Sequence, residues 1–523
     1  MTGAGRLLWL VLRRDRVVLP IWVFGLGVMP ALSVAGFDSI FATDAERVQY
    51  ARVSASSAGF VGLYGPLHGD SLGELVVWRA GFIPVMVALM ALLTVIRHTR
   101  ADEEAGRTEL IRATAVGRYA PLVAALLATA LACVALGLVV AGSMIATGLP
   151  GGGSVALGVV FTLNGWFFAG VAAIAAQLTG SARGARAVAV LVLGVAYVLR
   201  LGGDIAALGD GRLSWLSSLS PIGWLQRVFP YGENAWWPAV PVLLAAVAAA
   251  TAAARLLAGR GLGAGLFASR PGPAGAGARL SSPLGLAWRL HRGLLCGWTA
   301  GFAALGLVFG AVGGSVAQLA EGSGGINEMF SELGGAGPVT DAYFATVATM
   351  CGVIVSLYAV QAALRVRDEE QNGHAELILA TSVRRTSWAA GHLLFALLGP
   401  ALALLAEGAL AGAAYGELTP VLGATMIQLP AVWVLAGVTV LLVGVLPRLA
   451  PVAWGAVALC LVLLLVGGLL GLHQWVLDLS PFTHVPQLPA AGFHAVPVMV
   501  LTLTAAALGV AGLAALRRRD IPA

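Results

Sequence analysis

The sequence predicts an all-α polytopic membrane protein with about twelve transmembrane helices in two parallel six-helix repeats. Three observations support this prediction: the composition, the length of the apolar segments and a polar motif that occurs twice. Of the 523 residues, 59% are hydrophobic and 11% are charged, whereas soluble domains carry about 25% charged residues. The chain is therefore too apolar to fold in water.

Apolar segments of roughly 20 residues recur along the chain, each long enough to cross about 30 Å of hydrocarbon as a helix. The alternation of a membrane β-strand is absent, which leaves helices as the structure that satisfies the backbone in lipid. In the first half we expect spans at 17–36, 76–96, 119–146, 154–179, 186–203 and 236–257. In the second half we expect them at 294–316, 341–364, 388–414, 421–446, 450–471 and 494–515.

The arginines lie mostly on one side of these spans. They cluster around the two termini and after the even-numbered spans, and the exceptions are Arg47, Arg52, Arg79, Arg200, Arg212 and Arg227. Positive residues near span ends stay in the cytoplasm. We therefore predict a multi-pass protein of the bacterial cell (inner) membrane with both termini cytoplasmic. The longer outside loops are expected at 37–75, 204–235, 317–340 and 472–493.

A Gly/Pro/Ala-rich stretch divides the chain and predicts a cytoplasmic linker at 259–282 between a first six-span repeat, 1–258, and a second, 283–523. Residues 7–35 have the layout of a signal peptide. The same layout recurs in mid-chain, so we expect an uncleaved span. All cysteines fall in apolar spans and predict small buried side chains: Cys133, Cys296, Cys351 and Cys460.

All 31 basic residues are arginine. A Walker A loop needs a lysine that reaches the nucleotide phosphates, so we expect no ATPase site on this chain. The eight histidines show no metal-ligand spacing, and no nucleophile motif such as G-x-S-x-G stands out. The sequence thus favours a transport subunit over an enzyme, with no catalytic residue, no metal and no cofactor of its own.

One polar segment occurs twice, between the second and third span of each half. Residues 100–118 read RADEEAGRTELIRATAVGR, and residues 367–385 read RDEEQNGHAELILATSVRR. Two weaker matches accompany it: Trp215 with Leu219-Ser220-Pro221 against Trp475 with Leu479-Ser480-Pro481, and Leu8-Trp9 against Ala287-Trp288. Both repeats begin and end on the cytoplasmic side, so they are parallel rather than inverted.

The repeated segment is acidic within basic surroundings. Its acidic and glycine positions are Glu103, Glu104, Gly106 and Glu109 in the first copy and Glu369, Glu370, Gly373 and Glu376 in the second. A spacing of three places Glu103, Gly106 and Glu109 on about a third of a helix surface, with Leu110 and Ile111 resting on neighbouring helices or the membrane. A solvated turn with Glu103–Arg107 pairing is one interpretation. A docking helix for a soluble partner is the other, and the second copy favours it.

These features resemble ABC-type exporter permeases of the type-2 class: an amphipathic opening helix, six spans per unit, R-x-x-E-x-x-G-x-x-E-L between spans two and three, and Ser-Pro before span six. The fused, arginine-rich form resembles polyketide-antibiotic (tetronasin-type) exporter permeases. The resemblance implies that the acidic segments are coupling helices for a separately encoded ABC ATPase, two copies per chain, which binds ATP-Mg. It also implies elbow helices at 4–15 and 283–292. Glu104 aligns with Gln371 and Arg112 with Leu379, so the two docking surfaces need not be alike.

Ser220-Pro221 and Ser480-Pro481 place serine at the N-cap and proline at the first position of a helix. The resemblance implies short re-entrant helices that close an outer gate, and a plain helix start explains the same residues. It also suggests that large side chains on spans two and eight line the substrate path, with packing or lipid contact as the alternative for each: Trp78, Phe82, Met86, Tyr343, Phe344 and Met350.

The spans hold no charged cluster, which favours an amphiphilic or apolar small-molecule cargo, such as a drug or polyketide antibiotic, over an ion or a sugar. An ion-coupled secondary transporter of the major facilitator type also has twelve helices in two parallel halves. Such a transporter needs intramembrane charges, and the chain offers Glu407 in the ninth predicted span. That alternative leaves the acidic repeat unexplained. The partners expected are the ATPase, the lipid bilayer and the cargo, and no nucleic acid.

Overall fold

The computed structural model describes residues 2–40, 43–209, 211–261, 263–267, 275, 277, 280, 282–320, 339–466 and 473–519. Within these ranges the chain forms helices and no strands. Ten helices there are long and apolar enough to cross a membrane, or up to eleven with one bent pair, and a shorter apolar helix covers Ala450–Leu464. The all-α polytopic architecture is confirmed, while the count of twelve remains a prediction.

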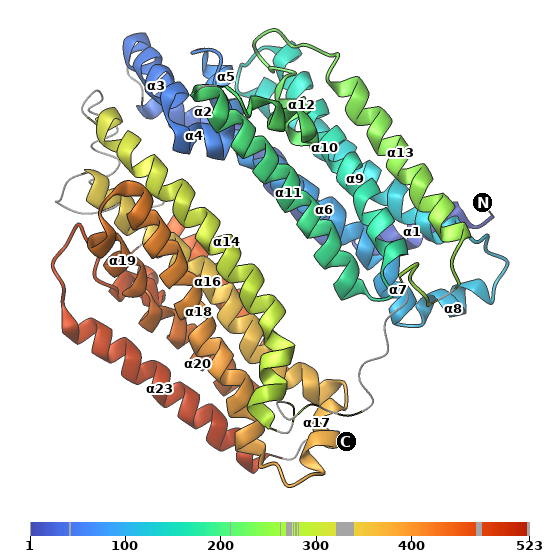
Figure 1. Cartoon of the computed structure of the whole chain (residues 1–523), viewed down its shortest axis with the longest axis vertical. Helices are drawn as coiled ribbons and strands as arrows, with labels where there is room; N and C mark the ends of the chain where they lie inside the picture. The colour runs from blue at the N-terminus through green and yellow to red at the C-terminus, as the bar shows by residue number, and fades with distance from the viewer. Residues whose placement is uncertain are drawn as a thin grey trace. The chain divides into compact units, whose positions relative to one another are not determined.

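The chain divides into two compact units, Met1–Gly272 and Pro273–Ala523. In unit 1 the long apolar helices run side by side, with α7 and α8 at one end and α3 at the other (Figure 1). Its helices are α1 Ala4–Arg14, α2 Val18–Ile40, α3 Asp44–Ser56, α4 Ala58–Tyr64, α5 Leu72–Arg79, α6 Ile83–Arg97, α7 Arg100–Glu104, α8 Arg107–Arg112, α9 Ala120–Ala146, α10 Gly151–Leu178, α11 Ala182–Leu208, α12 Pro221–Gln226 and α13 Ala239–Ala258.

Unit 2 repeats the bundle of long helices, with α17 beside the C-terminal end of α23 (Figure 1). Its helices are α14 Pro283–Ala320, α16 Val339–Gln371, α17 His374–Leu379, α18 Arg385–Tyr415, α19 Leu418–Met426, α20 Leu429–Val445, α21 Ala453–Val466, α22 Gln474–Leu477 and α23 Ala495–Arg518. Half of the predicted linker at 259–282, most of the predicted loop at 317–340 and the end of the span at 450–471 lie outside the described residues.

The predicted outside loop at 37–75 is largely helical, which corrects the sequence prediction. The helix α3 begins at a capping box, in which Thr43 Oγ1 accepts from the Glu46 N–H and the Glu46 carboxylate accepts from the Thr43 N–H. The short α4 follows, and α5 begins at Leu72. The prediction was wrong because it relied on hydropathy and overlooked this helix-start signal.

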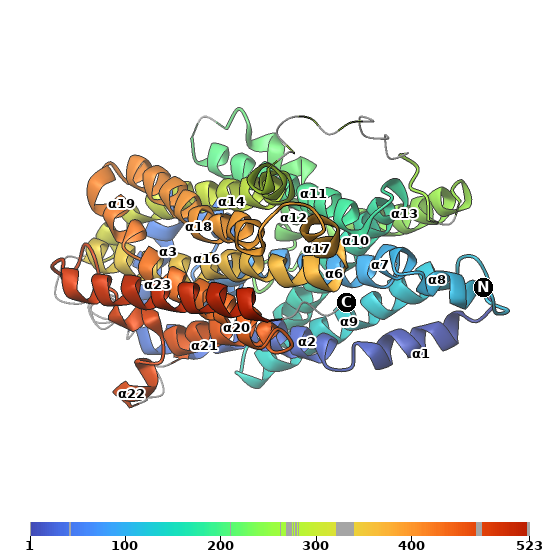
Figure 2. The ribbon, with the colours of Figure 1, turned by 90° about the horizontal axis from the view of Figure 1, so that it is seen from below.

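The two units differ in their first helices. In unit 1, α1 and α2 are separate helices bent by 71° (Figure 2), as predicted for an elbow at 4–15. In unit 2, α14 is one continuous helix from Pro283, so the separate elbow predicted at 283–292 is absent. The Trp9–Trp288 alignment places Leu294 opposite Asp15. Asp15 ends the first elbow and its carboxylate is held by Arg97 and His98, whereas a leucine has no such bonds to form.

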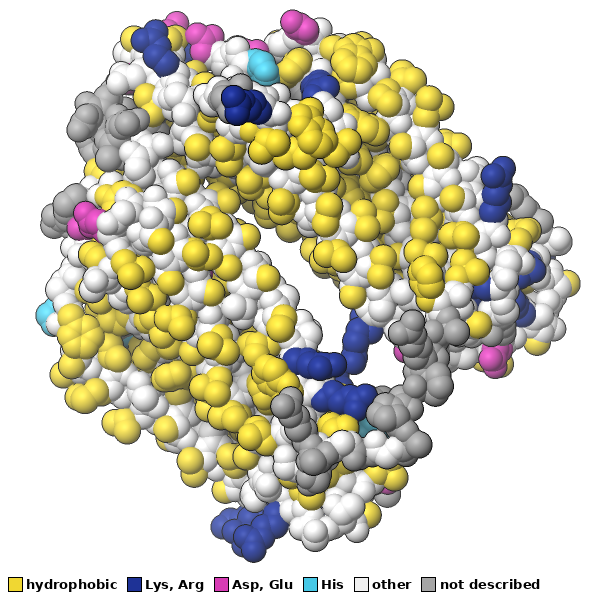
Figure 3. Space-filling model, viewed as in Figure 1, with side chains coloured by type: hydrophobic (Ala, Val, Ile, Leu, Met, Phe, Trp, Pro, Cys, Tyr) yellow, Lys and Arg dark blue, Asp and Glu magenta, His cyan; other side chains and the backbone are white. Residues whose placement is uncertain are grey.

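Glycines allow close helix packing in both units. A Cβ added at Gly306 or Gly310 of α14 would lie 2.2 Å from the carbonyl oxygen of Glu407 or Ala411 in α18. Small residues at such positions let helix backbones approach in lipid. The visible faces of the long helices are mainly hydrophobic (Figure 3). Of the cysteines, Cys296 is exposed rather than buried as predicted, and the other three are buried.

Candidate functional site

The repeated acidic segment folds in both units as a helix end, a glycine and a short helix. In unit 1, α7 and α8 flank Gly106, and in unit 2, α16 and α17 flank Gly373. The two glycines have φ of 72° and 71°, a left-handed conformation that glycine adopts readily. The predicted single helix through Glu103 and Glu109 is therefore wrong. The glycine breaks the helix, and the two glutamates do not share one helix face.

Glu103 is enclosed by partners at this end of unit 1. Its carboxylate accepts hydrogen bonds from Arg260 Nη1 and Nη2 and from the Gly263 N–H, each at 2.7 Å. Arg100 Nη1 lies 3.3 Å away. The side chains of Glu103 and Arg260 are each 6% exposed. Because Arg260 follows α13, this ion pair fastens the end of the last long helix of unit 1 to the acidic segment, and Glu103 is not open to a partner.

The aligned glutamate of the second copy, Glu370, makes the equivalent bond. Arg519 follows α23, and its Nη2 donates to Glu370 Oε2 at 2.5 Å. The last arginine of each copy adds a second matched bond: Arg118 Nη2 donates to the Arg260 carbonyl oxygen at 2.8 Å, and Arg385 Nη1 to that of Arg519 at 2.9 Å. Each unit thus clamps its last long helix to the acidic segment, and we call these two sets of contacts the clamps.

The first arginine of each copy also binds the backbone at the C-terminal end of a corresponding long helix. Arg100 Nε donates to the Ala176 carbonyl oxygen at 2.9 Å, and Arg367 Nε to that of Pro447 at 2.6 Å. Ala176 lies near the C-terminal end of α10, and Pro447 lies just beyond the C-terminal end of α20. The acidic segment is therefore also fixed to the corresponding long helix in each unit.

Matched contacts continue inside the long helices. Trp166 Nε1 in α10 donates to the Ala130 carbonyl oxygen at 3.2 Å, and Trp433 Nε1 in α20 to that of Leu397 at 3.1 Å. The sequence offset that aligns Arg100 with Arg367 aligns both members of these pairs. The repeat thus extends from a short motif into the packing of the helices.

Three further carboxylates of the segment also have partners, and Glu104 is exposed among them. Asp102 accepts from Arg14 of α1 at 2.8 Å, and Glu369 pairs with Arg365 at 2.6 Å. Glu104 Oε2 accepts from the Ala182 N–H at 2.9 Å, at the start of α11. Of the acids predicted to dock a partner, Glu103, Glu104, Glu369 and Glu370 are therefore engaged within the protein.

The other two acids, Glu109 and Glu376, are exposed, each next to an exposed leucine. Leu110 is 74% exposed and Leu377 is 75% exposed. Leu110 therefore does not pack on neighbouring helices, and its contact with the membrane, the other half of the prediction, remains a prediction. We call the pairs Glu109–Leu110 on α8 and Glu376–Leu377 on α17 the acid–leucine tips. Unlike the exposed Glu104, whose carboxylate accepts from the Ala182 N–H, the carboxylates of the tips have no hydrogen-bond or ion-pair partner among the described residues.

The Ser-Pro pairs begin helices as predicted. Pro221 is the first residue of α12, and Pro481 is the first residue of a 3-10 helix, Pro481–His484. Ser480 Oγ accepts from the Phe482 N–H at 3.4 Å, whereas the buried Ser220 side chain makes no cap. Their role in an outer gate remains a prediction.

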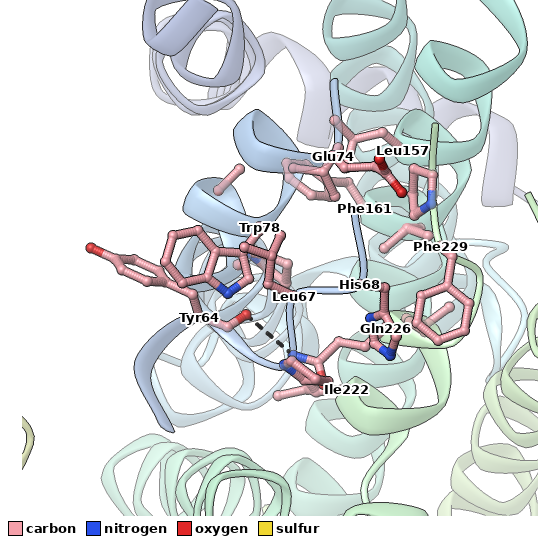
Figure 4. Close-up of a pocket in the computed structure, with 18 of the residues that line it drawn as sticks. Tyr64, Leu67, His68, Glu74, Trp78, Leu157, Phe161, Ile222, Gln226 and Phe229 are labelled. Carbon is pink, nitrogen blue, oxygen red and sulfur yellow. Dashed lines mark hydrogen bonds between the residues drawn. The ribbon is translucent and has the colours of Figure 1, made fainter. Parts of the chain in front are cut away.

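A cavity of about 90 Å³ lies beside α12 in unit 1 (Figure 4). Trp78, one of the predicted path residues, lines it and donates from Nε1 to the Gly65 carbonyl oxygen at 2.8 Å. His68 and Glu74 add polar groups, and burial lowers the pKa of His68. The volume suits a few water molecules, because drug-sized ligands need several hundred Å³.

The other path residues do not line this cavity. Phe82 and Met86 are half-buried on unit 1, and Met350 is half-buried on unit 2. Tyr343 is buried and donates to the Phe309 carbonyl oxygen at 3.0 Å, and Phe344 is buried beside it. A substrate path through these residues remains a prediction.

Glu407 lies on α18 and is 1% exposed. Within the described part of the chain neither carboxylate oxygen has a nitrogen or oxygen partner, and the Cys351 side chain is its neighbour. Carboxyls buried within membrane spans are often functional, so Glu407 is the residue on which an ion-coupled mechanism would depend.

The family described as "Multidrug efflux system permease Rv1217c, C-terminal domain" matches residues 6–260 and 280–517, one stretch in each unit. This chain belongs to that family of permeases. It is also 44% identical over 529 residues to the multidrug efflux system permease protein Rv1217c of Mycobacterium tuberculosis (strain ATCC 25618 / H37Rv), covering 99% of this chain and 95% of the relative.

These comparisons confirm the predicted resemblance at the level of efflux permeases, while the tetronasin-type assignment remains a prediction. Membership in a permease family supports a multi-pass membrane protein that acts as a transport subunit rather than an enzyme.

Sequence reasoning missed the partners of the acidic segments. Arg260 and Arg519 served in it only as markers of the cytoplasmic side. A signal was present, because each half has an arginine shortly after its last span. The contact between Asp15 and His98 at 2.5 Å could not be found in this way, because the second half has no acidic residue at the position aligned with Asp15.

Proposed function

We propose that this permease is the membrane-spanning subunit of an ATP-driven (ABC) exporter in the bacterial cell membrane, with both termini cytoplasmic. Its cargo is an amphiphilic or apolar small molecule, consistent with the name of its mycobacterial relative, a multidrug efflux permease. ATP-Mg binds to a separately encoded ATPase, of which two copies serve one chain. The observation that carries this proposal is the matched pair of acid–leucine tips.

A single exposed leucine on a protein surface is ordinary and needs no explanation. Leu110 and Leu377, however, occupy aligned positions, are exposed to nearly the same extent and follow a glutamate in both cases. Two copies of one soluble partner would meet the same acidic and apolar pair on each unit. The repetition therefore favours docking over a solvated turn.

The clamps suit the tips for transmitting movement. Through Arg260 and Arg519 each acidic segment is bonded to the end of α13 or α23, and through Arg100 and Arg367 to the end of α10 or α20. Displacement of a tip by a docked ATPase would move two long helices in each unit. A flexible loop without these bonds would dissipate the displacement.

The proposal is tested by co-purification of the detergent-solubilised permease with a co-expressed ABC ATPase. The variant is Glu109→Arg with Glu376→Arg, and the control is Glu233→Arg with Glu417→Arg, which reverses two exposed acids elsewhere. We expect the amount of ATPase that co-purifies with the tip variant to fall by about tenfold or more relative to the wild type, because reversed interfacial charges repel the partner. The control should retain the wild-type amount. Equal retention by the two variants would refute docking through the tips.

The alternative, an ion-coupled secondary transporter, depends on the isolated carboxyl of Glu407. Glu407→Gln removes the charge with little change of shape. In membrane vesicles that contain both subunits, we expect export to need ATP and to survive this substitution and the collapse of the proton gradient. The alternative would be established if export proceeds without ATP and is lost both in the Glu407→Gln variant and when the proton gradient is collapsed.

A further inference from the structure

An open basic pocket lies at the elbow of unit 1. It is lined by Leu10, Arg13, Arg14, Arg16 and Arg107. Trp9 lies next to it, is 60% exposed and carries the Arg13 guanidinium over its ring at 5.1 Å. Tryptophan and arginine side by side on an amphipathic helix are typical of the headgroup layer of a membrane.

The two carboxylates near this pocket are already paired, and Asp102 takes up two of the arginines that line it. Asp15 is buried and binds Arg97 at 3.0 Å and His98 at 2.5 Å. Asp102 binds both Arg14 and Arg107. Arg13 and Arg16 are exposed and form no ion pair among the described residues. The pocket therefore presents uncompensated positive charge.

An apolar groove begins where the basic pocket ends. It has a volume of about 370 Å³, starts at Asp15 and Arg16 and runs between α2 and α9. Its walls include Leu19, Val23, Phe24, Leu131, Ala135 and Val139. Further along, a Cβ on Gly27 would lie 2.7 Å from Val139, so the two helices are in close contact there and close the groove.

We propose that this site binds an anionic phospholipid of the cytoplasmic leaflet. The phosphate lies between Arg13 and Arg16, and one acyl chain occupies the groove between α2 and α9. The arginine side chains supply the charge that an anionic headgroup needs, and the groove offers an apolar surface directly beneath it.

The bend at the elbow creates this site. Because α1 turns away from α2 by 71°, its arginines stand over the open end of the groove. In unit 2 the aligned Arg292 and the nearby Arg289 are exposed on the continuous helix α14, which has no bend. The proposed site therefore belongs to unit 1, and the unit 2 arginines provide a matched control.

The experiment is native mass spectrometry of the full-length permease in detergent, titrated with phosphatidylglycerol or phosphatidylcholine. We expect phosphatidylglycerol to bind preferentially to the wild type. Arg13→Gln with Arg16→Gln should weaken it by about 25-fold, since each of the two arginines near an anionic headgroup adds roughly a fivefold gain. Arg289→Gln with Arg292→Gln should leave binding unchanged.

A second pair of measurements tests the groove. Ala135→Trp fills it without altering the arginines, and we expect it to weaken phosphatidylglycerol binding, with Ala135→Leu as a milder version. Glycerol phosphate, a headgroup without chains, should compete poorly. Equal losses in the two arginine variants would overturn the proposal. So would full phosphatidylglycerol binding by both Ala135 variants, or efficient competition by glycerol phosphate.

Discussion

Glutamates of the same acidic segment have opposite environments. Glu103 is held by Arg260 and Arg100, and its side chain is only 6% exposed. Glu109, which lies beyond the glycine on α8, is exposed. The sequence treats the two alike, because both are glutamates that recur in the second copy. The structure separates them into one residue that holds the segment and one that a partner can reach.

This separation predicts different effects on stability. Glu103→Gln removes the charge that compensates Arg260 and should lower the free energy of unfolding by about 3 kcal/mol, as for a broken buried ion pair. Glu370→Gln should act in the same direction through Arg519. Glu109→Gln should change stability by less than about 0.5 kcal/mol. Unfolding curves in detergent measure all three, and equal effects of Glu103→Gln and Glu109→Gln would contradict the clamp.

At the scale of elements, a single glycine decides the shape of each acidic segment. Gly106 and Gly373 have positive φ, and a Cβ at either would meet nothing within 4 Å. Substitution is therefore costly through the backbone alone. This explains why the same break occurs in both units although the flanking residues, Ala105 and Asn372, differ.

Gly106→Ala and Gly373→Ala should each destabilise the protein by about 1–2 kcal/mol, the cost of a left-handed conformation for a residue with a Cβ. Asparagine tolerates this conformation better, so Gly106→Asn should cost less than Gly106→Ala. Gly142→Ala in the last turns of α9, where the added Cβ also meets nothing, serves as the control and should cost nothing. Thermal unfolding in detergent gives the comparison. An alanine at position 106 that is harmless would show that the helix break is dispensable.

The element scale is also where the two halves differ. The first elbow is a separate helix because Asp15 is held by Arg97 and His98, and the second half has Leu294 at the aligned position. A similar apolar and basic sequence before the first span of each half led to the prediction of two elbows. The second half lacks this carboxylate and also has Gly293 and Leu295 at the positions of Arg14 and Arg16.

At the scale of the whole molecule, each unit has the acidic segment at one end and a different set of short helices at the other. The arginines gather at the acidic end, which the positive-inside rule assigns to the cytoplasm. Both units should therefore expose their tips on the same side of the membrane.

Cysteine labelling tests this orientation. In a Cys296→Ser background, Glu109→Cys and Glu376→Cys should react with a membrane-impermeant maleimide in inside-out vesicles, and Glu233→Cys and Glu417→Cys in right-side-out vesicles. The remaining native cysteines are buried and should react slowly. Labelling of positions 109 and 376 from opposite sides would contradict parallel repeats.

The membrane class, the approximate positions of the long helices and the acidic repeat could all be predicted from the amino-acid sequence. These follow from hydropathy over about twenty residues and from short identical motifs, both of which are local properties. Which carboxylates are enclosed depends on how the helices pack, and the sequence did not predict it. Arg260 is far from Glu103 in sequence, and Arg519 is far from Glu370. Helix packing brings these charges together. A local sequence pattern cannot predict such a pair, because its two residues are far apart along the chain.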